Sequence, residues 1–183
     1  FGGTPADIEE IGGFAATAIT ALTAQDTTGV HGVHPVPIDF IRQQMQVVLG
    51  DIGADCIKTG MLHSSEVIEA VTDVIERNAA GIPVVVDPVM VAKGGAALLD
   101  PDATTALKSR ILKAASVIMP NLPEAEVLIG MTIENLDDMT RAGDALLEMG
   151  ARAAIIKGGH LPGAKVHDLL VTPNGNEVFS AAR

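Results

Sequence analysis

P-V-V-V-D-P-V-M-V-A-K-G-G, residues 83–95, is the stretch that decides the fold class. Its three consecutive valines are β-branched and predict a strand that is buried on both faces. Pro88 cannot donate a hydrogen bond to a sheet ladder, so regular pairing is expected to stop just after Asp87. A carboxylate at the carboxyl end of a buried strand, followed by Lys93-Gly94-Gly95 in a loop, is typical of small-molecule sites in open α/β sheets.

The composition indicates one globular domain whose partners are small molecules. The 183 residues are 48% hydrophobic and carry a formal net charge of −11, with no basic run. This balance argues against nucleic acid and anionic membranes as partners. Four Phe, with no Trp and no Tyr, are too few for a platform that stacks bases. A nucleotide would therefore have to be held by a few local lysines, backbone N–H groups and metal ions.

The cysteine content predicts a cytoplasmic protein. Cys56 is the one cysteine, so no disulfide can form within the chain, which fits a reducing cytosol. It falls inside a predicted strand and is interpreted as a small buried hydrophobic residue. The start of the sequence lacks the basic and apolar regions of a signal peptide, and no apolar run approaches the ~18 residues that cross a bilayer.

Strand and helix signals alternate along the chain. Strands are predicted at 15–20, 55–59, 83–87, 115–119 and 153–157, with a hairpin formed by 168–172 and 177–180. Helices are predicted at 37–50, 64–77, 101–113, 122–129 and 135–149, with Asp100 as the cap of the third. This alternation predicts a mostly parallel sheet with helices on both faces, in a single α/β domain over residues 1–183.

Polar residues follow four of the predicted strands. They are Thr59, Asp87, Asn121 with Glu124, and Lys157 of the run Lys157-Gly158-Gly159-His160. The carboxyl ends of parallel strands lie along one edge of a sheet, so these residues are expected to converge there. The sequence therefore predicts a binding site at that edge.

Each of these residues also has a purely structural interpretation. Asp87 before a proline can be a turn former, or it can coordinate a metal or water or deprotonate a substrate hydroxyl. Asn121 and Glu124 can be the cap and first turn of a helix, or they can hold a hydrated Mg²⁺. Lys157 with its two glycines can be a tight turn beside a solvated lysine, or a phosphate-binding element. The sequence contains no G-x-x-x-x-G-K-[ST], G-x-G-x-x-G or G-x-S-x-G motif.

Five segments together resemble one family. They are A-I-T-A-L-T-A-Q-D-T (18–27), K-T-G-M-L (58–62), V-D-P-V-M-V-A-K-G-G (86–95), P-N-L-P-E-A-E (120–126) and K-G-G-H (157–160). In order and spacing, from about Gly12 to the C-terminus, they are similar to hydroxymethylpyrimidine/phosphomethylpyrimidine kinase of thiamine biosynthesis. This family belongs to the ribokinase-like superfamily, so the resemblance implies a three-layer α-β-α fold with a mostly parallel central sheet.

The resemblance also implies an activity and a set of site residues. The activity is ATP- and Mg²⁺-dependent phosphorylation of the hydroxymethyl group of a pyrimidine and then of the resulting monophosphate, by a homodimer. The runners-up are a pyridoxine or pyridoxal kinase of the same fold and a non-catalytic pyrimidine-binding domain. The implied roles are Gln25, Met61 and Val89 in substrate binding, Asp87 and Glu124 at Mg²⁺, Asn121 and Lys157 at ATP, and Asp87 and Lys157 in catalysis.

Two parts of the family pattern are short or missing in this sequence. The family begins with a strand and the loop S-G-G-A-G-I-Q-A-D, of which only Gly2-Gly3 and Ala6-Asp7-Ile8 are matched. Its G-T-G-C or G-T-G-D motif, which supplies an anion hole and the presumed base, falls after Arg183. We therefore expect that a chain ending at Arg183 cannot phosphorylate its substrate.

Overall fold

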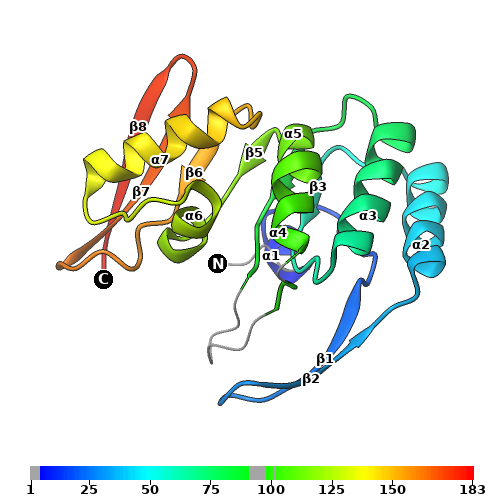
Figure 1. Cartoon of the computed structure of the whole chain (residues 1–183). Helices are drawn as coiled ribbons and strands as arrows, with labels where there is room; N and C mark the ends of the chain where they lie inside the picture. Colours follow the sequence, from blue (N-terminus) through cyan, green and yellow to red (C-terminus); the bar gives the residue numbers. More distant parts are fainter. Residues whose placement is uncertain (1–4, 91–97, 101) are drawn as a thin grey trace.

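The structure is a computed structural model that describes residues 5–90, 98–100 and 102–183 of the chain. Two sheets form, a two-stranded hairpin and a six-stranded central sheet (Figure 1). The strands are β1 Ala21–Gln25, β2 Val30–Pro35, β3 Ile57–Thr59, β4 Val84–Val86, β5 Val117–Ile118, β6 Ala154–Ile156, β7 Lys165–Thr172 and β8 Gly175–Ala182. The helices are α1 Pro5–Glu10, α2 Ile38–Asp51, α3 Ser65–Asn78, α4 Ala103–Ala106, the π-helical segment η1 Leu107–Ile111, α5 Leu112–Ala114, α6 Leu122–Ile129 and α7 Leu136–Glu148.

The central sheet is mostly parallel, as the sequence predicts. Its strand order is β3-β4-β5-β6-β7-β8, so consecutive strands are neighbours. The pairings from β3 to β6 are parallel, and β7 and β8 add an antiparallel hairpin at the far edge. This hairpin turns at Pro173-Asn174, and its strands are longer than the predicted 168–172 and 177–180. The parallel strands put their carboxyl ends on one edge, which is the edge that positions the site.

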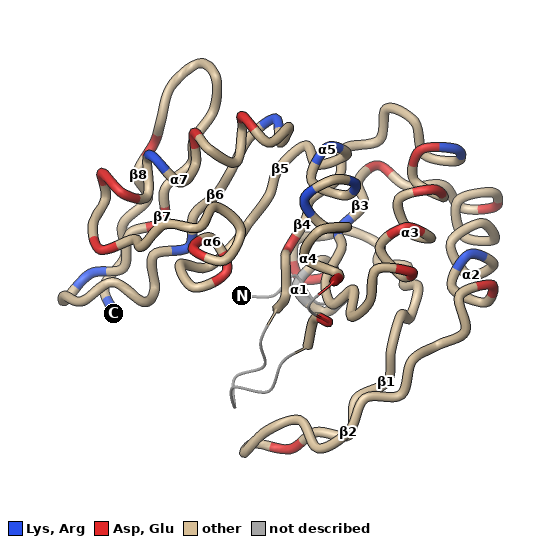
Figure 2. The backbone as a smooth tube through the Cα atoms, in the orientation of Figure 1, with Lys and Arg blue, Asp and Glu red and all other residues tan. Residues whose placement is uncertain are grey.

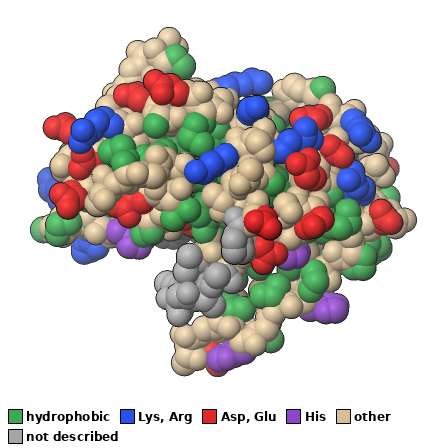
Figure 3. Space-filling model, viewed as in Figure 1, with side chains coloured by type: hydrophobic (Ala, Val, Ile, Leu, Met, Phe, Trp, Pro, Cys, Tyr) green, Lys and Arg blue, Asp and Glu red, His purple; other side chains and the backbone are tan. Residues whose placement is uncertain are grey.

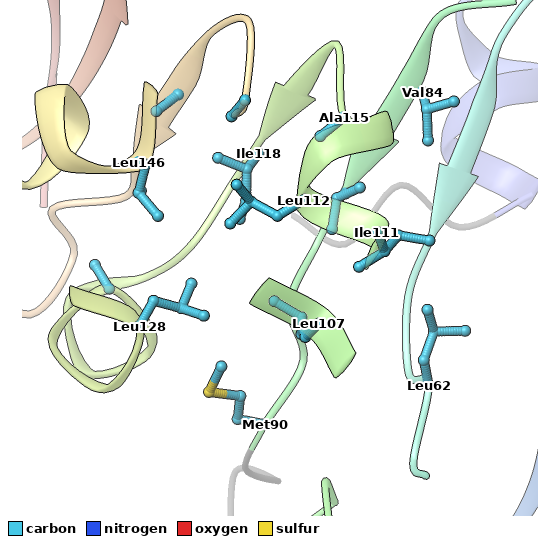
Figure 4. Close-up of a cluster of buried hydrophobic side chains, with 14 of the residues drawn as sticks. Leu62, Val84, Met90, Leu107, Ile111, Leu112, Ala115, Ile118, Leu128 and Leu146 are labelled. Carbon is cyan, nitrogen blue, oxygen red and sulfur yellow. The ribbon is translucent and has the colours of Figure 1, made fainter. Parts of the chain in front are cut away.

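The core lies between the sheet and the row of helices in front of it in Figure 1. Val84, Val86, Ile118, Ala154 and Ile156 are all at most 2% exposed. Figure 4 shows Leu107, Ile111, Leu112 and Leu146 packed over these strands. Burial of this many aliphatic side chains is the main driving force for the fold.

The opposite face of the sheet is less completely covered. The alternate strand residues Lys58, Val85, Val117 and Ile155 are only partly buried. The short helix α1 lies behind β3 and β4 on that side (Figure 1). The prediction that β4 is buried on both faces is therefore wrong for Val85, although helices flank the sheet as expected.

Side-chain capping explains where α3 and α7 begin. The Ser64 hydroxyl accepts from the Val67 N–H at 3.4 Å, and the Asn135 side chain accepts from the Asp138 N–H at 2.9 Å. The segment predicted as one helix at 101–113 is instead α4, η1 and α5 in succession. The described helix begins at Ala103, so Asp100 is not its cap.

Two sequence predictions near the start of the chain are wrong. Residues 15–20 form no strand, because the Gln44 side chain of α2 satisfies the backbone of Ile19 instead. Its Oε1 accepts from the Ile19 N–H at 2.9 Å and its Nε2 donates to the Ile19 carbonyl at 3.0 Å. Cys56 is exposed, because β3 begins one residue later at Ile57.

Charged side chains of both signs are interspersed over the visible surface (Figures 2 and 3). One cluster is structural: Asp73 of α3 pairs with Arg42 of α2 at 3.3 Å and with Arg110 of η1 at 2.9 Å. These pairs tie three helical segments together, α2, α3 and η1. No helix in the described ranges has the length and apolarity needed to cross a membrane.

Candidate active site

The carboxyl edge of the sheet brings Asp87 and Lys157 together. Asp87 follows β4 and is only 7% exposed, and Lys157 follows β6, two strands away in the sheet. The Lys157 Nζ donates to Asp87 Oδ1 at 3.1 Å, across 70 residues of sequence. The predicted convergence of these two residues is confirmed. The pair places an ammonium and a carboxylate where open α/β sheets bind ligands.

Asn121 and Glu124 form the first turn of α6 beside this pair. The Asn121 Oδ1 accepts from the Glu124 N–H at 2.9 Å, and Glu124 Oε2 accepts from the Asn121 N–H at 2.8 Å. This is a reciprocal capping box, so the structural interpretation of the motif is correct. Asn121 also forms an isolated parallel bridge with Lys157, which attaches the helix start to the end of β6.

Glu124 is held in an environment that favours its protonated form. Burial is the largest cause that raises its pKa above the ordinary value of 4.5, and the nearby Asp87 charge adds to the effect. The backbone N–H of Asn121 and the Lys157 charge oppose it, with a smaller contribution from the Met90 N–H. A buried carboxylate coupled electrostatically to both Asp87 and Lys157 belongs to the same site, in addition to its capping role.

The turn after Lys157 is fixed by contacts that the sequence did not suggest. The Gly158 N–H donates to Asp168 Oδ1 of β7 at 2.9 Å, and a Cβ at Gly158 would lie 1.9 Å from the His167 carbonyl oxygen. The Arg183 guanidinium donates to the carbonyls of three residues in the following loop, Gly159, Leu161 and Gly163. These contacts hold the backbone that carries Lys157, and Asp168 and Arg183 gave no motif signal.

Lys58 is a further residue to which the sequence reasoning assigned no site role. Its Nζ lies 3.6 Å from Asp87 Oδ2, from the neighbouring strand β3. Its register partner in the ladder is Val85, two residues before Asp87 on the same face of the sheet. The period of two along a strand is the signal that could have placed Lys58 beside Asp87.

Met61 and Val89 lie in the loops that follow β3 and β4, and both are half-buried. The Thr20 hydroxyl donates to the Met61 carbonyl at 2.8 Å, which fixes the first of these loops. The hydroxyl of Thr59, at the end of β3, is buried without a hydrogen-bond partner among the described residues. These positions border the same carboxyl edge as Asp87.

Gln25 is the one predicted site residue that the structure places apart from this edge. It ends β1 in the hairpin that projects from the body of the molecule (Figure 1), and it is exposed. Its side chain accepts from the Thr23 hydroxyl at 3.3 Å. The predicted loop Lys93-Gly94-Gly95 lies outside the described residues.

The residues at this edge fit a magnesium site that is completed by phosphate and water. Mg²⁺ is commonly held through one or two carboxylates plus substrate oxygens, and Asp87 and Glu124 provide two buried carboxylates. Within the described ranges there is no group of three or more His, Cys, Asp or Glu that would form an all-protein metal cage. The donor set therefore suits Mg²⁺ with a phosphate ligand.

Comparison with known sequences places the chain in a family. Residues 2–183 match the sequence model of phosphomethylpyrimidine kinase. The hydroxymethylpyrimidine/phosphomethylpyrimidine kinase of Bacillus subtilis is 48% identical over 163 residues, which cover 87% of this chain. The matched part spans 60% of the length of that relative.

Solved structures agree with this placement. The phosphomethylpyrimidine kinase of Clostridium difficile superimposes with a TM-score of 0.86 at 38% identity, covering 94% of this chain and 74% of that one. A Bacillus subtilis pyridoxal kinase in an ADP complex superimposes with a TM-score of 0.85 at 33% identity, covering 96% and 66%. The ribokinase-like fold expected from the motifs is thus confirmed. On the match over nearly its whole length, the chain belongs to the phosphomethylpyrimidine kinase family.

Proposed function

We propose that this chain provides the substrate and phosphate edge of an ATP-dependent kinase. Its substrates would be 4-amino-5-hydroxymethyl-2-methylpyrimidine and the corresponding monophosphate, phosphorylated in turn for thiamine biosynthesis. The observation that carries the proposal is the Lys157–Asp87 pair at 3.1 Å, at the carboxyl edge of the sheet. Family membership supports the same reading.

Catalysis in this proposal is mainly positioning and charge neutralisation at the phosphoryl group. Lys157 contacts the ATP phosphates and offsets the negative charge that develops during transfer. Asp87 holds Lys157 in place before the nucleotide binds. Asn121 and Glu124 fix the start of α6 next to Lys157, so the phosphate-binding groups are preorganised by secondary structure.

Asp87 and Glu124 would hold Mg²⁺ through their carboxylates. The metal would supply charge compensation for the phosphates of ATP. Burial raises the pKa of Glu124, and a cation bound beside it would favour the ionised form that can act as a ligand.

Met61 and Val89 would form the wall of the pyrimidine pocket, and Gln25 would reach the aminopyrimidine as a hydrogen-bonding group. The likeness to a pyridoxal kinase supports pyridoxal phosphorylation as the second candidate. Pockets that differ by a few atoms discriminate only modestly, so a side activity on pyridoxal fits the same edge.

We also propose that the protein is a homodimer. Apolar side chains on the hairpin and on α2 are exposed, among them Leu22 at 56%, Phe40 at 54% and Val47 at 62%. An isolated two-stranded hairpin is at best marginally stable in water, so cover from a second subunit would stabilise it.

The test is ADP formation by the full-length protein with the hydroxymethylpyrimidine and, separately, with pyridoxal. Lys157→Ala should lower turnover at least about a hundredfold, because it removes a charge at the transferring group. Lys165→Ala is the matched control, since Lys165 is an exposed lysine at the start of β7. Equal turnover by both variants would refute the assignment of Lys157, and pyrimidine binding without ADP formation would favour a non-catalytic binding domain.

A further inference from the structure

We infer that Lys58 is a positioning residue of this edge. It remains beside Asp87 as a counter-ion and so allows Lys157 to move from Asp87 to a phosphate. The inference rests on the proposed function and adds a residue to it. It concerns a lysine that lies inside a strand, away from the loops to which site roles were assigned.

The two oxygens of Asp87 face different ammonium groups. Lys157 Nζ donates to Oδ1 at 3.1 Å, while Lys58 Nζ lies 3.6 Å from Oδ2. The Asp87 side chain is 9% exposed, and those of Lys58 and Lys157 are 24% and 28% exposed. One carboxylate thus lies between two partly buried ammonium groups, and the Lys157 ammonium is the nearer of the two.

The two lysines differ in their place in the sheet. Lys58 is the central residue of β3, and its ladder partner Val85 lies two residues before Asp87. Lys157 follows the end of β6, at the carboxyl edge where open α/β sheets bind ligands. Lys157 is therefore the ammonium placed to change from Asp87 to a ligand, and Lys58 is the one that stays beside Asp87.

Movement of Lys157 to a phosphate would remove the hydrogen-bonded cation from a nearly buried carboxylate. A buried charge without a partner is strongly unfavourable, so before a metal ion is bound such a move requires a second cation at Asp87. Lys58 is already at 3.6 Å and provides it. Without Lys58, pairing with Asp87 and binding of phosphate would compete for the same ammonium.

This competition predicts a specific pattern of ATP affinities in the full-length protein. Lys58→Met should weaken ATP binding about tenfold, measured by calorimetry in EDTA so that metal binding by Asp87 does not contribute. In an Asp87→Asn background the same substitution should have no effect, because no carboxylate then retains Lys157. Lys58→Arg, which keeps the charge, should bind ATP like the parent protein.

The thermal unfolding midpoints of the same four variants separate this role from a purely structural one. If Lys58→Met lowered the unfolding midpoint but left the ATP affinity unchanged, the inference would be overturned and the proposed function would stand. Equal loss of ATP affinity in both backgrounds would also overturn it, because Lys58 would then contact the phosphates itself. A parent protein that binds no ATP would overturn the proposed function together with the inference.

Discussion

Replacing Gly158 by alanine should destabilise the protein more than any other single added methyl group at this edge. A Cβ at this position would lie 1.9 Å from the His167 carbonyl oxygen and 3.2 Å from the terminal methyl of Met139. The first neighbour is backbone of β7 and cannot rotate away, so β6 and β7 must separate by roughly 1 Å. The same movement would lengthen the hydrogen bond from the Gly158 N–H to Asp168.

The magnitude follows from these two contacts. Overpacking against fixed atoms costs about 1–3 kcal/mol, and loss of a hydrogen bond to a charged acceptor costs about 1.5–3 kcal/mol. We therefore expect Gly158→Ala to lower the free energy of unfolding by about 4 kcal/mol. For a chain of this size that corresponds to a fall in Tm of about 8–16 °C.

The neighbouring glycine provides a matched control for this experiment. A Cβ at Gly159 would meet nothing within 4 Å, and Gly159 is exposed without a positive φ. Gly159→Ala should therefore stay within about 0.5 kcal/mol of the parent in urea unfolding. If Gly158→Ala were as stable as Gly159→Ala, the close packing of this turn against β7, and the account of how Lys157 is held, would be wrong.

Three further substitutions test the packing and electrostatics around the site. Gly143→Ala should destabilise by about 1–3 kcal/mol in urea unfolding, because its Cβ would lie within 2.7 Å of the Val171 side chain, and Val171→Ala in the same chain should relieve part of the loss. The free energy of unfolding of Glu124→Gln should change less with pH than that of the parent. Because the pKa of Glu124 is raised in the folded state, the parent loses stability as pH rises from 4.5 through the folded-state pKa, whereas the amide does not titrate. Arg183→Ala should speed amide hydrogen exchange in residues 159–163, measured by mass spectrometry, with an unchanged exchange rate in α3 as its control.

The sequence predicted the parallel part of the fold because its signals were local and strong. The valines of β4 and the cap at Ser64 each specify their element without help from distant residues. The hairpin β1–β2 was missed because its strands carry few apolar residues at regular spacing, and most of their side chains are exposed. The false strand at 15–20 is apolar enough to pair, but a side chain of α2 satisfies its backbone at Ile19. Such a contact depends on tertiary structure and leaves no trace in the local pattern.

The site residues that come at the ends of parallel strands could be predicted from the sequence. Those that contact the site from a neighbouring strand or hairpin could not. Asp87 and Lys157 were placed by the rule that parallel strands end on one edge. Lys58 was overlooked because a lysine inside a strand was not matched to the face that carries Asp87. Asp168 and Arg183 support the turn after Lys157 from the antiparallel hairpin, whose register the sequence does not specify.

The charges at this edge explain how a chain with a net charge of −11 could present the proposed phosphate-binding surface. Lys58 and Lys157 together exceed the charge of Asp87 by one unit, and burial favours the neutral form of Glu124. The local balance is therefore neutral to positive, while the acidic residues that set the net charge are spread over the rest of the surface. At physiological ionic strength, charges more than about 8 Å apart in solvent are largely screened from one another. For an anionic ligand that has reached the edge, the attraction of Lys58 and Lys157 therefore outweighs the repulsion from the net negative charge of the chain.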